Sequence, residues 1–216
     1  LFRSRQSLKN EDVLYRLIGK DAEILIDHAW GREPCTIAHI KAYRSSAKSL
    51  GAGQVLSSPY PWHKARLVVR EMAESLAQEL TAGQLASAEF SLSVAYDRSS
   101  LTDGYDGAVE ADRYGRTVPK AVHGTAHLGA PTASMQRIAG GVLGVFDRVC
   151  DRSLLVRRLN LSAEHVVPQT AEQGDLFTAP AAQKREQALQ QTMLRIQSKF
   201  GKNAILKGSD FEDGAT

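Results

Sequence analysis

The chain has 216 residues and a mass of 23.5 kDa, a length typical of one or two domains. Hydrophobic residues make up 43% and charged residues 24%, which is enough apolar material for a core and too much for a disordered chain. The apolar runs are too short for a membrane-spanning helix, and the net charge is only +3. We therefore expect no membrane partner and, because the sequence shows no signal peptide, a cytoplasmic protein.

The first part of the chain is predicted to be a helical piece followed by a linker. It begins without an initiator Met or the apolar stretch of a signal peptide, so we expect a fragment of a longer protein. Apolar residues recur at helical spacing over residues 11–30, where Gly19 interrupts and Gly31 ends the pattern. We predict a helical segment over residues 1–35 and a linker with little periodicity over 36–47.

Residues 48–168 are predicted to form an α+β domain. The expected elements, in chain order, are a strand over 48–56, a turn over 57–61, a helix over 62–80, a strand over 88–96, a hairpin excursion over 99–119, a strand over 120–128, a helix over 134–150 and a strand over 154–162. This order predicts a four-stranded sheet with both helices on one face, a split βαβ arrangement. Ser134 is a typical N-cap for the second helix.

The other face of this sheet is predicted to be open and polar. Strands with one buried face alternate apolar and polar residues, and here the polar positions carry small or basic side chains. They are Ser91, Ser93, His123, Thr125, Arg158, Asn160 and Ser162. Such groups can approach a phosphate backbone closely. Because no aromatic pair is present to stack bases, duplex is a better fit than single-stranded RNA.

The two predicted helices each contain a feature that opposes stability. The first helix is basic in its first half and acidic in its second, the reverse of what the helix dipole favours. This inversion suggests that its basic end has a role other than stability. In the second, Gly140, Gly141 and Gly144 each weaken the helix by about 1 kcal/mol relative to Ala. We expect close packing against the sheet to compensate.

Charged residues are segregated along the chain. Residues 36–70 contain basic but no acidic side chains, residues 71–112 are acidic apart from Arg98, and residues 113–160 are again mainly basic. Two basic blocks that meet in space would form a face suited to phosphates, whereas blocks that stay apart would be solvated surface without a partner.

Side chains for metal binding or catalysis are few. Cys35 and Cys150 are too few for a disulfide framework or a Cys-rich zinc site, and both are expected to be buried thiols. The acidic loop at 103–107 lacks the ligand spacing of a calcium loop, and His123 and His127 have no third ligand. Without clustered carboxylates or a nucleophile motif, the sequence predicts no metal site, no cofactor and no catalytic residue. A binding module is favoured over an enzyme.

Residues 169–216 are predicted to be a flexible tail with a terminal helix. The composition loosens after Pro168, and a helical stripe over 183–200 ends at Gly201. Within the tail, the pentapeptide QGDLF at 173–177 places two apolar residues after a polar anchor.

Several ordered motifs together resemble Y-family lesion-bypass DNA polymerases. HAWG at 28–31 and KSLG at 48–51 resemble the passage from thumb to little finger in that family. The UmuC-type branch is similar in YGR at 114–116, VPK at 118–120, HGT at 123–125, LVRRLN at 155–160 and KFGKNAIL at 199–206. The resemblance implies a thumb remnant and a little finger of a polymerase of DNA repair and the SOS response.

In that family the little finger lays its sheet along the DNA and holds backbone phosphates of the primer-template duplex. The positions that the resemblance implies for DNA binding are Arg44, Lys48, Ser49, Gly51, Lys120, His123, Gly124, Thr125, Arg157 and Arg158. Because Arg157 alternates with Leu155 and Leu159, its side chain could instead be directed towards the helices. The family's catalytic carboxylates lie in a palm that has no counterpart here, so Mg²⁺ is expected only in the parent polymerase.

The pentapeptide resembles the motif that binds the bacterial sliding clamp. This implies clamp contacts by Gln173, Asp175, Leu176 and Phe177, while Gly174 departs from the usual Leu and should weaken them. Alternatively, the Leu-Phe pair docks on its own domain. For the whole chain two alternatives remain: a non-catalytic protein-interaction module, and an enzyme in its own right that would need a carboxylate cluster.

Overall fold

A computed structural model describes residues 11–43, 48–102, 105–112, 114–169, 180–201, 204, 205 and 208. The chain divides into two compact units, Leu1–Ser46 and Ala47–Thr216, each of which is treated by itself. None of the described helices combines the length and the apolar composition that crossing a membrane requires.

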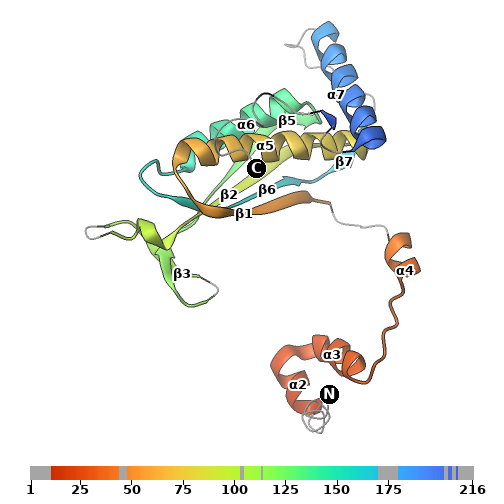
Figure 1. The fold of residues 1–216 in the computed structure, drawn as a ribbon, viewed down its shortest axis with the longest axis vertical. Coiled ribbons are helices and arrows are strands. Elements are labelled where there is room, and N and C mark those ends of the chain that lie inside the picture. The colour runs from red at the N-terminus through yellow and green to blue at the C-terminus, as the bar shows by residue number, and fades with distance from the viewer. Residues whose placement is uncertain are drawn as a thin grey trace. The chain divides into compact units, whose positions relative to one another are not determined.

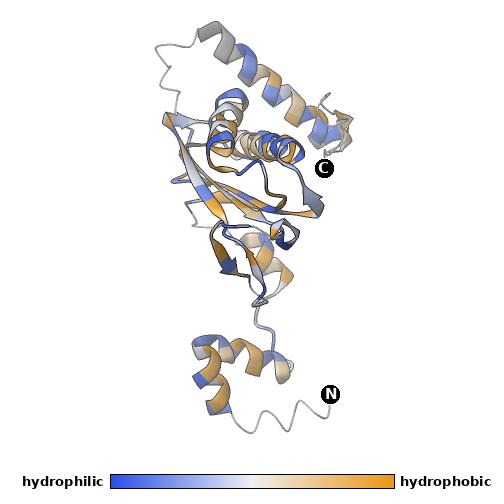
Figure 2. Ribbon diagram, turned by 90° about the vertical axis from the view of Figure 1, so that its left-hand side faces the viewer, coloured by the Kyte–Doolittle hydropathy of each residue, from blue (hydrophilic) through white to orange (hydrophobic). Residues whose placement is uncertain are grey.

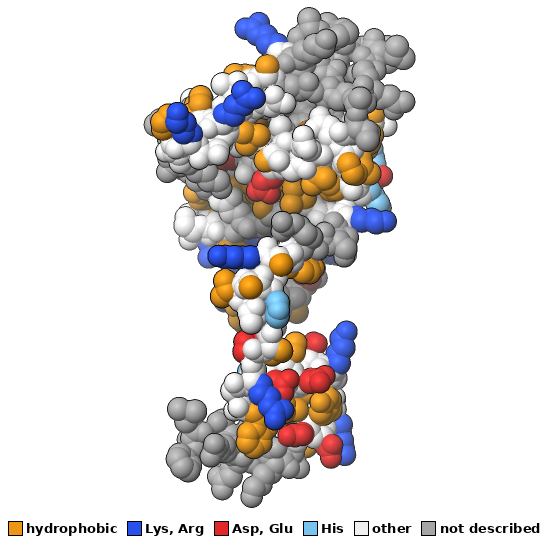
Figure 3. Space-filling model, turned by 90° about the vertical axis from the view of Figure 1, so that its right-hand side faces the viewer, with side chains coloured by type: hydrophobic (Ala, Val, Ile, Leu, Met, Phe, Trp, Pro, Cys, Tyr) orange, Lys and Arg blue, Asp and Glu red, His pale blue; other side chains and the backbone are white. Residues whose placement is uncertain are grey.

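The first unit consists of short helices with little core. Helix α2 (Glu11–Ile18), the 3₁₀ turn η2 (Gly19–Asp21) and helix α3 (Ala22–Ala29) follow one another. Gly19 and Gly31 have φ of 61° and 75°, a left-handed backbone that glycine adopts at little cost, so the predicted interruption and end of the helical segment are confirmed. Only Ala22 and Ile26 are buried among the described residues, and apolar side chains lie at the surface between charged ones (Figure 3).

The stretch predicted as a linker contains a further helix, α4 (Ile37–Ala42). Thr36 caps it, because its hydroxyl accepts from the His39 N–H at 3.2 Å while the Thr36 N–H donates to His39 Nδ1 at 3.4 Å. The prediction that Cys35 is buried is wrong: it is exposed, since residues 32–36 form no regular structure and pack in no core.

The second unit is built on an antiparallel sheet with the spatial order β1-β6-β2-β5 (Figure 1). Its strands are β1 (Leu50–Tyr60), β2 (Leu85–Tyr96), β5 (Val122–Thr132) and β6 (Val156–Glu164). Helix α5 (Trp62–Ala82) joins β1 to β2, and helix α6 (Met135–Val149) joins β5 to β6. In each case another strand lies between the two that the helix connects, so the predicted split βαβ fold is confirmed.

Several strand boundaries in this unit differ from the prediction: β2 begins at Leu85, β5 continues to Thr132, and β1 extends into the predicted turn. Residues 57–60 are not a turn, because β1 continues to Tyr60, and only Pro61 separates it from α5. The polar side chains of Ser57 and Ser58 are exposed on an outer strand, where water replaces a second strand neighbour. Proline is compatible with this place, since an outer strand can lack one ladder N–H and a helix start has free N–H groups.

The core lies between the sheet and the two helices. Alternate residues of β2 are buried, among them Phe90 at 0% and Leu92 at 2% exposure, and they face Val69 of α5 and Phe146 of α6 within one apolar cluster. Figure 2 shows both helices on the same side of the sheet. Cys150 is buried as predicted, and burial raises the pKa of its thiol to about 11.

Within the basic end of α5, Arg66 helps to hold the two helices together, so this one charge contributes to stability. Arg66 donates to Asp147 of α6 through Nε at 2.8 Å and Nη2 at 3.1 Å. Its guanidinium also lies 5.7 Å from the ring centroid of Trp62, over which Arg152 lies at 4.5 Å.

Close packing against the sheet was expected to compensate for the three glycines of α6, and it is found at one of them. A Cβ on Gly141 would lie 2.6 Å from Leu128 Cδ2, so α6 approaches β5 closely there. A Cβ on Gly140 or Gly144 would meet nothing within 4 Å.

Smaller elements lie between β2 and β5 and after β6. Beyond η3 (Arg98–Ser100), strands β3 (Val109–Ala111) and β4 (Thr117–Pro119) form a hairpin inside the predicted excursion. Strand β7 (Val167–Pro168), which the sequence did not indicate, pairs with the start of β2.

The terminal helix α7 (Pro180–Phe200) begins three residues before the predicted start and ends before Gly201, as predicted. It docks beside the start of α6, where the Glu186 carboxylate accepts from the Ser134 hydroxyl at 2.8 Å and from the Gln136 N–H at 3.0 Å. Gln190, only 3% exposed, donates to the Ala133 carbonyl at 3.2 Å. Ser134 also caps α6 as predicted, because its hydroxyl accepts from the Arg137 N–H.

Candidate nucleic-acid interface

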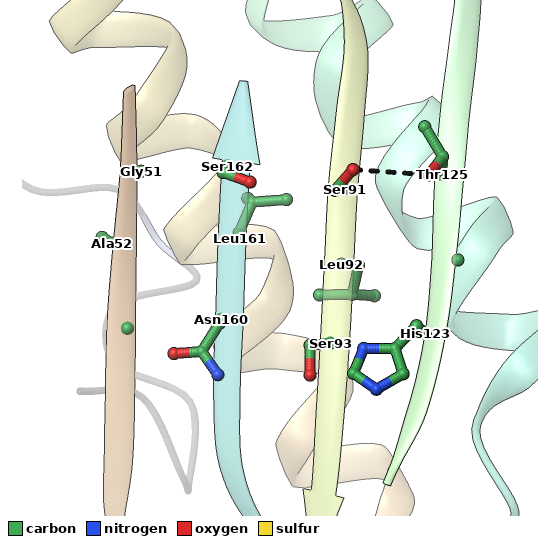
Figure 4. Close-up of a pocket in the computed structure, with 12 residues that line it drawn as sticks. Gly51, Ala52, Ser91, Leu92, Ser93, His123, Thr125, Asn160, Leu161 and Ser162 are labelled. Atoms are coloured by element: carbon green, nitrogen blue, oxygen red, sulfur yellow. Dashed lines mark hydrogen bonds between the residues drawn. The ribbon is translucent and has the colours of Figure 1, made fainter. Parts of the chain in front are cut away.

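The sheet face away from the helices carries a hollow of about 510 Å³ crossed by two rows of small polar residues (Figure 4). The residues of each row are neighbours in the strand register, with one from each of the four strands. The first row is Gly51, Ser162, Ser91 and Thr125, and the second is Gly53, Asn160, Ser93 and His123. The face predicted from strand alternation is therefore the face that the structure leaves open.

At β1 the hollow is lined by two glycines, so no side chain of these positions covers the sheet there. A Cβ on Gly51 would lie 2.8 Å from the Leu161 carbonyl oxygen and from Ser162 Cβ. A Cβ on Gly53 would lie 2.4 Å from Asn160 Oδ1. The absence of side chains at these positions lets another backbone approach the sheet.

The polar groups of the two rows are uncharged or weakly basic. Ser91 Oγ and Thr125 Oγ1 lie 3.3 Å apart in the first row, within hydrogen-bond distance. The second row ends on the exposed imidazole of His123. Hydroxyl, amide and imidazole groups can donate to phosphate oxygens. In the first row the Ser162 hydroxyl donates to Oε1 of Glu164, so one carboxylate contacts that row.

The two ends of the open face differ in charge. Beyond the second row lies the exposed Arg158, which pairs with Val55 of β1 and Ala95 of β2. Beyond the first row, the Glu89 carboxylate lies between two imidazoles: Oε2 is 3.1 Å from His165 Nδ1 and Oε1 is 3.7 Å from His127 Nδ1.

The side chain of Arg157, next to Arg158, is directed towards Leu56 of β1 and Asp97. The register shifts between Ala95 and Tyr96, so Arg157 is an extra residue in a β-bulge. Its guanidinium donates to the Leu56 carbonyl and lies 3.8 Å from the Asp97 carboxylate. Burial opposes ionisation of Asp97, but N–H and hydroxyl donation from Ser99 and the charge of Arg157 outweigh it and lower its pKa.

The residues implied for DNA binding fall into separate groups. Gly51, His123, Gly124 and Thr125 line the hollow, and Arg158 lies on the same face next to it. Lys48 and Ser49 are exposed just before β1, and Lys120 is exposed between β4 and β5. Arg44 and the pentapeptide residues Gln173, Asp175, Leu176 and Phe177 lie outside the described residues.

Gly124 lines the hollow only with its backbone. A Cβ there would point to α6 and lie 2.6 Å from Val145 Cγ1 and 3.1 Å from Val149 Cγ1. The glycine is therefore explained by helix packing. Gly53, by contrast, was not among the expected site residues, although it follows Gly51 by two positions and a strand places such residues on one face.

No group of three or more His, Cys, Asp or Glu side chains that could hold a metal ion occurs in the part of the chain that the structure describes. The fold defines an α+β domain with one helix-covered and one open polar sheet face. A model of the impB/mucB/samB family C-terminal domain matches residues 47–176, a range that begins with the second unit and includes all its strands. The chain therefore belongs to the impB/mucB/samB family, and the predicted resemblance to Y-family polymerases is confirmed. A comparison with curated proteins gave no match.

Proposed function

We propose that the open face of the sheet holds the backbone of duplex DNA, as the DNA-binding part of a lesion-bypass DNA polymerase. The observation that carries this proposal is the pair of residue rows across all four strands, which offers hydroxyl, amide and imidazole groups over a hollow. Family membership supports it.

The expected mode of binding is independent of base sequence. Small side chains bring phosphate oxygens close to the sheet, where Ser and Thr hydroxyls donate to them, and Arg158 adds a charge-assisted contact. Such contacts fix the position of a duplex without distinguishing bases. Nucleotide insertion, with Mg²⁺, is assigned in this proposal to the palm of the parent polymerase.

A salt titration of the full chain with a fluorescent primer-template duplex tests the proposal. Phosphate contacts release counterions, so affinity should fall steeply as salt rises and should be the same for unrelated sequences. Arg158→Ala should lower the salt slope by roughly one unit. Arg148→Ala, the matched loss of an exposed charge on α6, should leave the slope unchanged.

Two outcomes count against this function. Duplex binding that is absent at low salt, or a slope unchanged by Arg158→Ala, would remove the open face as a phosphate site. Salt-insensitive binding of another protein would instead favour a protein-interaction module.

We propose as a second activity of the same polymerase that residues 173–177 recruit the sliding clamp. The support is the sequence itself: Gln173 can anchor by hydrogen bonds, while Leu176 and Phe177 can enter an apolar pocket. Deleting 173–177 should abolish clamp binding and spare duplex binding in the same preparation. Clamp affinity that survives this deletion would refute the assignment.

A further inference from the structure

The β3–β4 hairpin projects from the sheet on the side away from α5 and α6, as Figures 1 and 2 both show. It leaves the body after the end of β2 and returns at the start of β5, so it flanks the open face. A duplex lying on that face would therefore meet the hairpin at its side.

The described residues at the tip of the hairpin are hydrogen-bonded to one carboxylate. Asp112 Oδ1 accepts from the N–H groups of Tyr114 at 2.8 Å and Arg116 at 2.9 Å, and Oδ2 accepts from Arg116 Nε at 2.8 Å. Gly115, with φ of 73°, donates its N–H to the Asp112 carbonyl at 2.8 Å. These bonds connect the described residues of the tip to one another.

The tip presents an aromatic ring and a guanidinium together. Arg116 lies 4.9 Å from the ring centroid of Tyr114, and the side chain of Arg116 is 53% exposed while Tyr114 as a whole is 66% exposed. A guanidinium has five N–H donors in a planar fork. Asp112 occupies one edge of that fork, and no acceptor among the described residues occupies the other edge.

The acidic side chains of the hairpin are turned to its own donors. Glu110 accepts from the Ala121 N–H at 3.0 Å. The side chain and N–H groups of Arg116 lower the pKa of Asp112 to about 2, so this carboxylate stays ionised and held at neutral pH. Glu110 and Asp112 are thus held by donors within or next to the hairpin, and Arg116 and the exposed Lys120 can contact an anion.

We propose that the hairpin tip is a second nucleic-acid contact, which grips the side of the duplex that lies on the open face. Arg116 donates the free edge of its guanidinium to a backbone phosphate, and the Tyr114 ring packs against the adjoining sugar or base. A stacked, carboxylate-held Arg beside an exposed Tyr suits this ligand, because guanidinium forks match phosphate and aromatic faces accept nucleoside rings. This inference rests on the proposed function of the open face.

The test compares the full chain with Tyr114 and Arg116 variants in the same salt titration. Arg116→Ala should weaken binding and lower the salt slope by roughly one unit. Arg116→Lys should keep the slope but weaken binding, because a point charge replaces the fork. Tyr114→Ala should weaken binding roughly fivefold at every salt concentration, at the low end of base–aromatic stacking, while Tyr114→Phe should retain affinity.

Arg158→Ala and Arg148→Ala, measured in parallel, separate the two proposals. If Arg158→Ala lowers the slope while all tip variants bind like the unmodified chain, the hairpin contact is overturned and the open face stands. If the unmodified chain fails to bind duplex, the function of the open face fails first. Unchanged circular dichroism and Tm in the tip variants exclude loss of the fold as a cause of weaker binding.

Discussion

The two faces of the sheet use the same strands for different purposes. On β2, Phe90 and Leu92 face the helices and are nearly fully buried, whereas Ser91 and Ser93 between them line the open hollow. Since side chains alternate along a strand, a single sequence position decides whether a residue packs in the core or lines the open face. The apolar face needs α5 and α6 to cover it, and the polar face needs no cover.

Glycines show the same division between the faces. Gly124 leaves space for α6, because a Cβ would press on Val145, a side chain in the core. Gly53 leaves space on the open face, where a Cβ would crowd the amide end of Asn160 and make an ordinary contact with the Leu159 carbonyl oxygen. The first glycine should therefore matter for folding and the second for what approaches the sheet.

Replacing adjacent residues of β2 gives the largest contrast. Phe90→Ala should lower the free energy of unfolding by about 3–5 kcal/mol, because it opens a cavity in the core. Ser91→Ala should change it by about 1 kcal/mol or less, since only its contact with Thr125 is lost. Urea denaturation followed by circular dichroism measures both, and equal effects would contradict the division between the faces.

The paired glycines give the next largest effect. Gly124→Ala should lower the free energy of unfolding by about 1–3 kcal/mol, because the added methyl group overpacks the contact with Val145. Gly53→Ala should be within about 0.5 kcal/mol, because exposed Asn160 can turn away, but it should weaken duplex binding. A stable Gly124→Ala variant would show that α6 can shift without cost.

The order of the elements in the second unit and its open face could be predicted from the sequence. Apolar alternation over 88–96 and helical spacing over 134–150 are local signals, and the order of the elements restricts the topology. The polar rows follow from the same alternation, because residues on one face of each strand become neighbours once the register is set.

Features that depend on a partner far along the chain could not be predicted. The bulge at Arg157 arises from how β6 pairs with two neighbours, and the use of Arg66 depends on Asp147 of another helix. The packing role of Gly124 depends on the approach of α6. Local sequence patterns contain no information on contacts between residues that are far apart in the sequence. The hairpin tip is a local feature, and Gly115 between Asp112 and Arg116 could have suggested it.

A third prediction tests whether helix α7 contributes to the stability of the fold without affecting duplex binding. Gln190→Ala removes a donor from the buried Ala133 carbonyl and should cost about 1–2 kcal/mol. Amide hydrogen exchange should increase in α7 while the sheet stays protected and duplex affinity stays unchanged. Loss of duplex binding in this variant would mean that the helix layer and the open face are coupled.

The smallest expected effect is a gain in the free energy of unfolding. Gly140→Ala should raise the free energy of unfolding by about 0.5–1 kcal/mol, because the new methyl group meets nothing and the unfolded chain loses freedom. Gly141→Ala is the matched control one residue away, where the methyl group would crowd Leu128, so the gain should be absent or reversed. Thermal unfolding measures both variants. A higher Tm for Gly140→Ala with unchanged duplex affinity would separate helix stability from the open face, since this residue touches neither the core nor the proposed DNA surface.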